Sequence, residues 1–410
     1  MKILVITNLY PPHEIGGYEL RCRDVCDRLK ASGHEIHILT SDHRVPGRQE
    51  ISEPHVSRKL RINGMYGNPW LPIQRLYALE KHNHETLARE IEAARPDIIH
   101  VWNMGGISKS LLLRIEQGTV PVVYDVSDHW IARSLRADVW LSWWNAPGSF
   151  ARSALRGILT CAGIRSIINR SVPTGSWDTI RFSKIYFCSA FMRDLTASKG
   201  WHVGHADVIH CGIQTAAFPV KSDHSQFEKL LWVGRLSSDK DPLTAIRALA
   251  AARRNGVTQL TLDLYGHGDP ECVAVVDAEI ANLGLTDCVF RKSAPAAEMR
   301  KLYSQYDALL FTSNWGEPFA LTPLEAMSSG LPVITSLDGG QPELARHEVN
   351  CLIAEAANPE LYATRITELA ASPQLRESIA ATGLDEARTR FDIDPITRQI
   401  EALLLNALKS

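Results

Sequence analysis

The sequence has 410 residues, of which 45% are hydrophobic and 22% are charged, and its formal net charge is −2. This length predicts two domains of about 200 residues each, and the ordinary composition excludes extended disorder. No apolar run reaches about 18 residues, so the sequence predicts no membrane-spanning helix.

Short apolar or β-branched runs alternate with amphipathic stretches along the chain, which is typical of parallel sheets covered by helices. The first run is too short for the core of a signal peptide, so we expect it to be a strand of a cytoplasmic protein. A first series of expected strands covers residues 2–7, 35–40, 97–102, 121–126, 184–189 and 206–209. A second series covers residues 229–233, 260–265, 288–291, 306–312, 331–336 and 351–354.

The two series predict an α/β fold with two doubly wound, Rossmann-like domains that face each other across a cleft. We expect an N-terminal domain at residues 1–210 and a C-terminal domain at residues 211–385. Residues 386–410 are expected to form a helix that packs back towards the N-terminal domain. In such sheets ligands bind beyond the carboxyl ends of the strands, so the loops after the strands are the place to look for chemistry.

The first of these loops ends in the pair Gly16-Gly17, and a helix is expected from there to about Ala31. Glycines at a helix N-terminus let backbone N–H groups approach a phosphate or a sugar closely. A plain turn explains the pair equally well.

A second loop, residues 234–242, follows the expected strand 229–233 and carries Arg235 and Lys240. A guanidinium and an ammonium on one loop can together neutralise a diphosphate. The alternative is that both cations form ordinary surface ion pairs.

The third segment, residues 315–327, places Glu317 in a loop and Glu325 in the helix that follows. Ionised carboxylates only accept hydrogen bonds, so this pair is suited to the hydroxyls of a sugar and a ribose. Glu325 has a structural alternative, because Thr322 and Glu325 match a capping box with Pro323 at the first helical position. Glu317 has no comparable alternative.

Together these motifs, with the segments 330–334 and 339–344, resemble family 4 of the glycosyltransferases, which adopt the GT-B fold. The resemblance covers nearly the whole chain and is most specific over residues 229–345. It implies transfer of a hexose-type sugar, with retention of anomeric configuration, from a nucleotide-sugar donor. The N-terminal domain would bind a saccharide, lipid-linked or small-molecule acceptor, and the C-terminal domain would bind the donor.

The resemblance also implies roles for individual residues. Arg235 and Lys240 would hold the diphosphate, Glu317 the transferred sugar and Glu325 the ribose. Arg235, Lys240 and Glu317 are the candidate catalytic residues. No metal or other cofactor is expected, and the DxD-like segment 392–394 lies beyond the second sheet and is interpreted as a decoy.

Further contacts to the donor would come from backbone groups. Phe319, Ala320 and Leu321 would line the sugar and the phosphate together with Gly234, while Gly17 would approach from the opposite wall. Ala320 replaces the glycine that is usual in the family, which predicts a narrower pocket.

The acceptor side departs from the family pattern after the expected strand 121–126. Ser127 stands where family members usually carry a histidine. Asp128 and His129 are therefore the candidates to replace that histidine near the sugar.

The insertion at residues 129–182 is rich in tryptophan and arginine, and residues 133–199 hold ten Lys and Arg against three Asp and Glu. Four of its tryptophans, Trp130, Trp140, Trp143 and Trp144, cluster beside this basic excess. One interpretation is peripheral contact with an anionic membrane on its inner face, because tryptophans at helical spacing beside arginines suit a headgroup layer. The other is that the tryptophans pack onto the N-terminal domain.

Two other functions fit a two-domain sugar-binding fold. A GT-B sugar-nucleotide epimerase or phosphorylase would release a free or phosphorylated sugar rather than a new glycoside. A non-catalytic sugar-binding protein would not need paired cations beside Glu317. Nucleic-acid binding is not expected, because no recognised fold motif accompanies the basic stretch.

Overall fold

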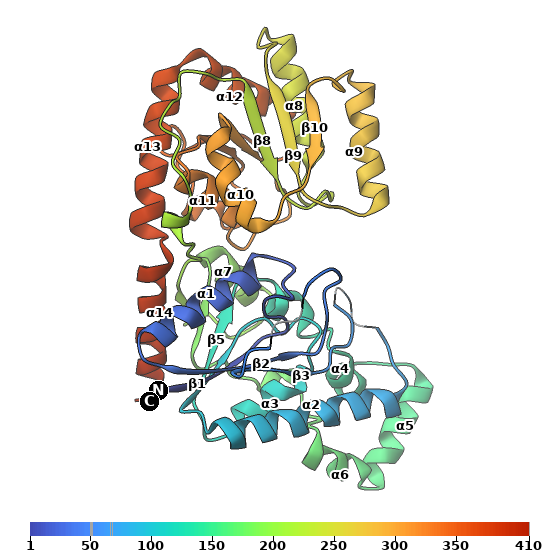
Figure 1. Cartoon of the computed structure of the whole chain (residues 1–410). Helices are drawn as coiled ribbons and strands as arrows, with labels where there is room; N and C mark the ends of the chain where they lie inside the picture. Colours follow the sequence, from blue (N-terminus) through green and yellow to red (C-terminus); the bar gives the residue numbers. More distant parts are fainter. Residues whose placement is uncertain (50–51, 66, 68, 410) are drawn as a thin grey trace. The chain divides into compact units, whose positions relative to one another are not determined.

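The computed structural model describes residues 1–49, 52–65, 67 and 69–409 (Figure 1). The chain forms two compact α/β units, each built on one parallel sheet. Met1–Ile209 and Thr397–Ser410 make up the first unit, and His210–Ile396 make up the second. The expected fold class of two Rossmann-like domains is therefore confirmed.

The first unit has a sheet of seven parallel strands in the order β3-β2-β1-β4-β5-β6-β7. Its strands are β1 (Lys2–Ile6), β2 (Glu35–Ser41), β3 (Val56–Leu60), β4 (Ile98–Val101), β5 (Val122–Val126), β6 (Ile185–Phe187) and β7 (Asp207–Val208). Every strand of this sheet except β3 was expected from the sequence. The strands β1, β4 and β5 are almost completely buried, since helices cover a doubly wound sheet on both faces.

Seven helices accompany this sheet in the described part of the first unit. They are α1 (Gly17–Ala31), α2 (Ile73–Ala94), α3 (Ser110–Glu116), α4 (Val139–Asn145), α5 (Phe150–Cys161), α6 (Ile164–Ser171) and α7 (Ala190–Ser198). A single π-helical turn at Trp130–Ser134 precedes α4.

The second unit has a sheet of six parallel strands in the order β10-β9-β8-β11-β12-β13. Its strands are β8 (Lys229–Val233), β9 (Thr261–Tyr265), β10 (Val289–Lys292), β11 (Ala308–Phe311), β12 (Val333–Thr335) and β13 (Leu352–Ile353). Its helices are α8 (Pro242–Arg254), α9 (Pro270–Asn282), α10 (Ala296–Leu302), α11 (Leu321–Ser328), α12 (Pro359–Ala371) and α13 (Pro373–Arg390). The core lies between the sheet and the alanine-rich face of α8, which packs on α12.

The last helix, α14 (Ile393–Ala407), contributes to both units, because its residues from Thr397 onward belong to the first. His34 Nε2 lies 2.7 Å from Glu401 Oε1 and joins α14 to the turn before β2. The expected boundary at residue 386 falls inside α13. The chain therefore enters the second unit after Ile209 and leaves it within a continuous helix.

The four clustered tryptophans of the 129–182 insertion point into the first unit rather than away from it. Trp130, Trp140, Trp143 and Trp144 are all buried. Trp140 donates a hydrogen bond to the Pro173 carbonyl (2.7 Å), and the rings of Trp143 and Trp144 lie 4.6 Å apart. The expectation that these tryptophans meet a membrane is therefore wrong, and the packing alternative holds. The reason is that α4 is apolar enough on every side to serve as a core helix.

In the part of the chain that the structure describes, every helix is too short or too polar to cross a lipid bilayer. This agrees with the hydropathy of the sequence.

Candidate active site

The loop that follows β8 is held by backbone contacts to the loop that follows β9. The Gly234 N–H donates to the Tyr265 carbonyl (3.0 Å), and the Leu236 N–H donates to the His267 carbonyl (2.8 Å). A side chain on Gly266 would overlap the Gly234 carbonyl, so the two loops can approach this closely only with glycine there. The start of the cation-bearing loop is thus fixed.

The end of the same loop is anchored to the carboxyl end of β11. The Thr312 hydroxyl donates to the Asp241 carbonyl (2.7 Å), and the Asn314 N–H donates to the Asp239 carbonyl (3.1 Å). Asp241 adopts a left-handed conformation (φ 48°) and caps α8. Lys240 lies between these two anchored residues, so its side chain projects from a rigid backbone.

Lys240 and Glu317 meet in an ion pair, although 77 residues separate them in the sequence. Glu317 is buried, and its Oε1 also accepts a hydrogen bond from the Ser313 hydroxyl (2.6 Å). The Lys240 ammonium lies 5.2 Å from the centre of the Trp315 ring, within range of a cation–π contact. Two residues that the sequence assigned separately therefore form one cluster.

Glycines and one aspartate fix the backbone of Glu317. The Gly316 N–H donates to Asp338 Oδ2 (2.7 Å), and the Gly340 N–H donates to the Glu317 carbonyl (2.7 Å). Gly339 has a left-handed backbone (φ 73°), and a Cβ at this position would overlap the Glu317 backbone. The 339–340 turn is therefore a backbone clamp on the carboxylate residue.

Arg235 lies on the same loop as Lys240 but has another partner. Its side chain is more than half exposed, and it pairs with Asp239 (3.1 Å) and with the Ser237 hydroxyl (3.3 Å). Although partial burial raises it, the hydrogen bond from Ser237 and the charge of Arg235 hold the pKa of Asp239 below its ordinary value. Both predicted cations are thus paired with carboxylates in this structure.

The helix α11 begins differently from the expectation. It starts at Leu321 with Ala320 as the N-cap residue, two residues earlier than a capping box from Thr322 to Glu325 requires. Pro323 is accordingly the third helical residue, not the first. The capping alternative for Glu325 is therefore wrong, and because alanine has no side-chain acceptor, the first N–H groups of α11 receive no cap from residue 320.

The Glu325 carboxylate accepts a hydrogen bond from the hydroxyl of Tyr303 (2.6 Å), a fully buried residue that the sequence analysis did not single out. Burial raises the pKa of Glu325, and the hydrogen bond from Tyr303 opposes the rise. The neighbouring Phe319 packs its ring on His210 (5.2 Å) and Phe391 (5.6 Å). Tyr303 therefore fixes the carboxylate on α11, and His210 and Phe391 pack on the residue two positions before the helix.

The DxD-like segment is part of the framework of the second unit. Asp392 accepts hydrogen bonds from the Thr215 N–H (3.3 Å) and hydroxyl (2.5 Å), and from the Asp394 N–H (2.9 Å). These contacts tie the start of α14 to the segment that follows the first crossing between the units.

In the first unit, Gly17 is the first residue of α1, as the sequence predicts. Glu19 closes this helix end, because its carboxylate accepts hydrogen bonds from the N–H groups of Gly16 (2.8 Å) and Ile15 (3.4 Å). Burial raises the pKa of Glu19 even though these N–H groups lower it. Two of the N–H groups near the glycine pair are thus already used within the protein.

Behind this helix end lies a buried ion pair that the sequence did not reveal. Arg21 and Asp125 meet at 2.8 Å with almost no exposed side-chain surface. Ser127 accepts a hydrogen bond from Arg21 (2.8 Å) and donates one to Asp125 (2.8 Å). Ser127 is therefore part of a structural network at the carboxyl end of β5.

Asp128 and His129 follow this network at the same end of the sheet. Asp128 Oδ1 accepts the Trp130 N–H (2.7 Å), and His129 is buried at the start of the π-helical turn. Burial, with a further contribution from the charge of Glu19, raises the pKa of Asp128 from 3.8 to about 7. A carboxyl group with this pKa can take up or release a proton near neutral pH.

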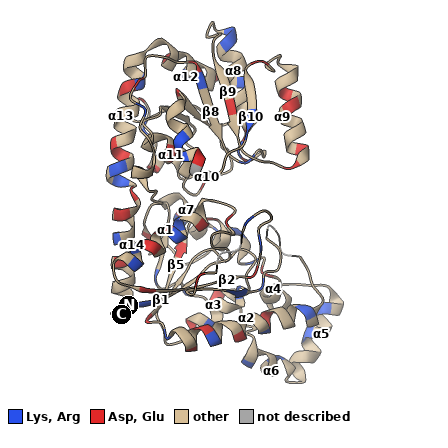
Figure 2. Cartoon of the chain, in the orientation of Figure 1, with Lys and Arg blue, Asp and Glu red and all other residues tan. Residues whose placement is uncertain are grey.

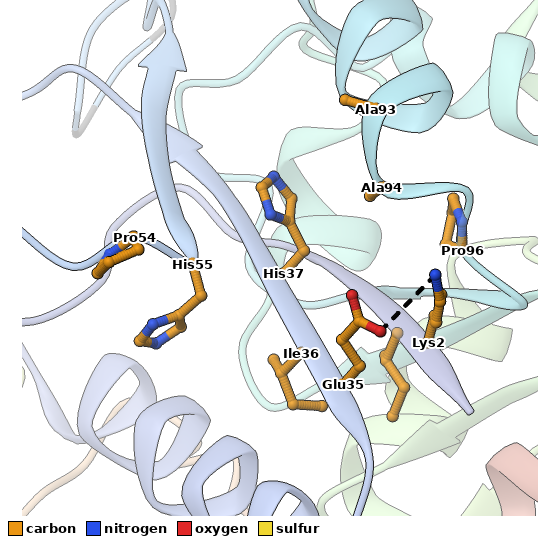
Figure 3. Close-up of a pocket in the computed structure, with 10 residues that line it drawn as sticks. Lys2, Glu35, Ile36, His37, Pro54, His55, Ala93, Ala94 and Pro96 are labelled. Atoms are coloured by element: carbon orange, nitrogen blue, oxygen red, sulfur yellow. Dashed lines mark ion pairs between the residues drawn. The ribbon is translucent and has the colours of Figure 1, made fainter.

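A pocket of about 340 Å³ lies at the amino ends of β1 and β2, where Lys2 and Glu35 form an ion pair (Figure 3). His37 and His55 also line it, and His37 Nε2 lies 2.7 Å from Glu90 on α2. Ligands of Rossmann-like sheets bind at the opposite, carboxyl ends of the strands. The predicted site residues lie at those carboxyl ends, so we assign no substrate to this pocket.

The sequence profile described as Glycosyltransferase Family 4 matches residues 15–217, and the one described as Glycosyl transferases group 1 matches residues 215–385. Spore coat protein SA from Bacillus subtilis strain 168 is 32% identical over 404 residues, which cover 95% of this chain and 96% of that protein. Sucrose-phosphate synthase from Thermosynechococcus elongatus has a similar structure (TM-score 0.73, 18% identity), with coverage of 100% of this chain and 99% of that one. HepE from Anabaena, solved in complex with UDP-glucose, is also similar (TM-score 0.68, 20% identity), with coverage of 99% and 100%.

Proposed function

The chain belongs to glycosyltransferase family 4 and has the GT-B fold, and on this basis we propose that it transfers a hexose-type sugar from a nucleotide-sugar donor with retention of anomeric configuration. The acceptor is a saccharide, a lipid-linked molecule or a small molecule. That HepE, a protein of the same fold, was solved with UDP-glucose supports a nucleotide sugar as the donor. The chain's own cations balance the charge of the donor, and the proposed reaction uses no metal or other cofactor.

The observation that carries this proposal is the cluster of Lys240, Glu317 and Ser313 at the carboxyl ends of β8 and β11. It joins a cation, a buried carboxylate and a hydroxyl at the place where an open α/β sheet binds its ligands. Arg235 projects from the same loop and adds a second cation. This set matches the needs of a sugar diphosphate, which combines negative charge with hydroxyl donors.

Breaking the bond between the sugar and the diphosphate places negative charge on the leaving group. Fixed cations at that position stabilise the transition state more than the ground state, because the charge develops as the bond breaks. In the structure Arg235 and Lys240 are paired with Asp239 and Glu317, so a bound diphosphate would compete with those two carboxylates. Release of Glu317 from Lys240 would leave its carboxylate able to accept hydrogen bonds from the sugar.

The remaining donor contacts would come from the start of α11. Phe319, Ala320 and Leu321 present backbone N–H groups at a helix N-terminus, which favours a phosphate there. Glu325, oriented by Tyr303, would accept hydrogen bonds from the ribose hydroxyls.

On the acceptor side we assign the proton transfer to Asp128. Its pKa of about 7 lets it accept a proton from an acceptor hydroxyl at neutral pH, as a general base. His129 and Gly17 complete the proposed acceptor and sugar contacts of the first unit.

The test starts with binding and continues with products. Thermal-shift measurements with UDP-, GDP- and ADP-glucose should show one donor raising the melting temperature in a concentration-dependent way, because a ligand that binds only the folded state stabilises it. That donor should then yield a nucleoside diphosphate and a new glycoside, and NMR should show the donor's anomeric configuration retained. Inverted product would disprove retention, and phosphorylated or free sugar as the main product would favour a phosphorylase or an epimerase.

A further inference from the structure

The helices α5 and α6 form a hairpin at the edge of the first unit, beyond α4 and the start of α2 (Figure 1). Ala162 and Gly163 join the two helices, and Gly163 has a left-handed backbone (φ 74°) that makes the short turn. The helices pack mainly against each other. Every residue of both helices is at least partly exposed, so the hairpin is an attachment to the unit rather than part of its core.

The outward side of this hairpin is apolar. Phe150 is 90% exposed, Ile158 is 64% exposed and Ile167 is 65% exposed. Leu155 and Ile164 are also among the exposed large apolar residues. Large apolar side chains normally face the core of the protein from a surface helix, so this orientation is reversed.

Two arginines of the hairpin, Arg156 and Arg165, face the unit instead. Arg156 donates hydrogen bonds to the carbonyls of Trp144 (3.1 Å) and Ala146 (2.9 Å) at the end of α4. Arg165 donates to the Thr174 carbonyl (2.8 Å), and its guanidinium lies 5.3 Å from the centre of the Trp144 ring. These contacts fasten the polar side of the hairpin to the unit and leave the apolar side outermost.

The hairpin also carries a one-sided charge. Between residues 139 and 177 the sequence has four arginines and no aspartate or glutamate, and α5 shows basic but no acidic residues in Figure 2. Arg170 on α6 is exposed. The apolar ridge is therefore set in a positive field.

We propose that the outer face of the α5–α6 hairpin docks on an anionic lipid bilayer, with Phe150, Ile158 and Ile167 inserted among the headgroups. Apolar ridges with basic residues behind them are typical of helices that lie in the plane of a membrane interface. A second copy of the chain would bring two positive hairpins together, which like-charge repulsion opposes. This outer face of the hairpin is not the tryptophan face that the sequence suggested as a membrane contact, because those tryptophans are buried.

Vesicle co-sedimentation of the full chain tests the proposal. The wild type should pellet with vesicles of phosphatidylcholine containing about a third phosphatidylglycerol, and much less with pure phosphatidylcholine, because charge and apolar insertion act together. The triple variant Phe150→Gln, Ile158→Gln and Ile167→Gln should bind about tenfold more weakly or worse. Arg170→Gln should weaken binding to the anionic vesicles by about fivefold, the effect of one basic residue near the surface.

A control variant carries three glutamines at exposed apolar positions outside the hairpin, which are 41–55% exposed. These substitutions are Val275→Gln, Val349→Gln and Leu405→Gln, and this variant should bind like the wild type. The proposal fails if the wild type stays in the supernatant with anionic vesicles or if the hairpin variant pellets as well as the wild type. It also fails if light scattering shows that the hairpin substitutions split a dimer while vesicles bind neither protein, since the face would then join copies of this chain.

Discussion

Two sets of ion pairs at the carboxyl ends of the two sheets illustrate different uses of charge. In the second unit, Lys240 and Arg235 keep part of their side chains exposed while they pair with Glu317 and Asp239. In the first unit, Arg21 and Asp125 form a pair that is closed off from solvent. Both sets lie where ligands bind in such folds, so position alone does not separate a site from a scaffold.

The difference in exposure decides what each pair can do. An exposed ion pair contributes little to stability and can exchange a partner for a ligand at small cost. A buried pair lacks that freedom, because separating it leaves an uncompensated charge away from water. The exposed Arg235–Asp239 pair is therefore suited to exchanging Asp239 for a phosphate, and the Arg21–Asp125 pair is suited to holding β5 and α1 together. The Lys240–Glu317 pair is intermediate, because Lys240 is partly exposed while the buried Glu317 keeps a hydrogen bond from Ser313.

The largest effect is expected from neutralising both donor-loop cations. The double variant Arg235→Gln and Lys240→Gln should lower the turnover rate by about 10⁴-fold, since one electrostatic donor in a transition state is worth about 10²–10³-fold. Release of nucleoside diphosphate from the donor found by thermal shift measures this rate.

The matched control for Lys240 is Lys221, which pairs with Asp307 (3.0 Å) elsewhere in the same unit. Lys221→Gln removes the same kind of pair and should leave the rate within about twofold of the wild type while costing similar stability. Full activity of the double variant would disprove the electrostatic role. Equal loss of activity in Lys221→Gln would show that the effect comes from unfolding.

The next effect is on stability and belongs to the buried pair. Arg21→Met should lower the free energy of unfolding of the first unit by about 3–5 kcal/mol, because Asp125 is left as an unpaired buried charge. Urea unfolding followed by circular dichroism measures this change. Arg254→Met, which breaks the exposed pair with Glu360 (3.0 Å), should cost less than about 1 kcal/mol. Similar costs for the two variants would contradict the distinction between buried and exposed pairs.

A third effect depends on pH and concerns Asp128, which lies beside the buried pair. Because its pKa is raised from 3.8 to about 7, the folded protein holds a proton that the unfolded chain has lost, and stability falls as the pH rises from about 4 to about 7. The amide side chain introduced by Asp128→Asn cannot ionise, and its oxygen can still accept the Trp130 N–H.

The variant Asp128→Asn should therefore match the wild type near pH 3.5 and exceed its stability by up to about 4 kcal/mol at pH 8, at about 1.4 kcal/mol per pKa unit. Unfolding curves at several pH values give the two profiles. Parallel profiles would mean that Asp128 is ionised in the folded protein, and it would then lack the pKa assigned to a general base.

The sequence predicted most of the fold because parallel strands buried on both faces appear as apolar runs. The strand β3 was missed because it is not an apolar run. It lies at the edge of its sheet and contains Arg58 and Lys59, since edge strands tolerate charged residues that central strands do not.

The site was predicted only as far as local motifs reach. Arg235, Lys240 and Glu317 follow strands directly, and the topology brings Lys240 and Glu317 together. Helical spacing correctly placed the tryptophans of the insertion on one helix face. Spacing alone does not show whether such a face packs on the protein or contacts a membrane. Contacts between distant segments, such as Arg21 with Asp125, leave no local pattern and could not be read from the sequence.

Tyr303 is another residue without a local signal, and it offers the smallest and most selective test of the donor site. Its hydroxyl donates to Glu325 and opposes the rise in the pKa of Glu325 that burial causes. Tyr303→Phe removes this hydrogen bond, so a larger fraction of Glu325 is protonated and accepts more weakly from the ribose hydroxyls than a carboxylate does. The KM for the donor should rise by about fivefold, equivalent to one hydrogen bond of about 1 kcal/mol, with kcat nearly unchanged.

The pH dependence separates this role from a general loosening of the fold. Raising the pH restores the Glu325 carboxylate, so the KM of Tyr303→Phe should approach that of the wild type as the pH rises. Tyr306→Phe is the control, because Tyr306 also donates to a carboxylate, Asp263, elsewhere in the second unit. Its KM should stay close to the wild-type value. A KM for Tyr303→Phe that equals the wild type at every pH would remove Glu325 from the donor site, whereas a rise that ignores pH would assign Tyr303 a purely structural effect.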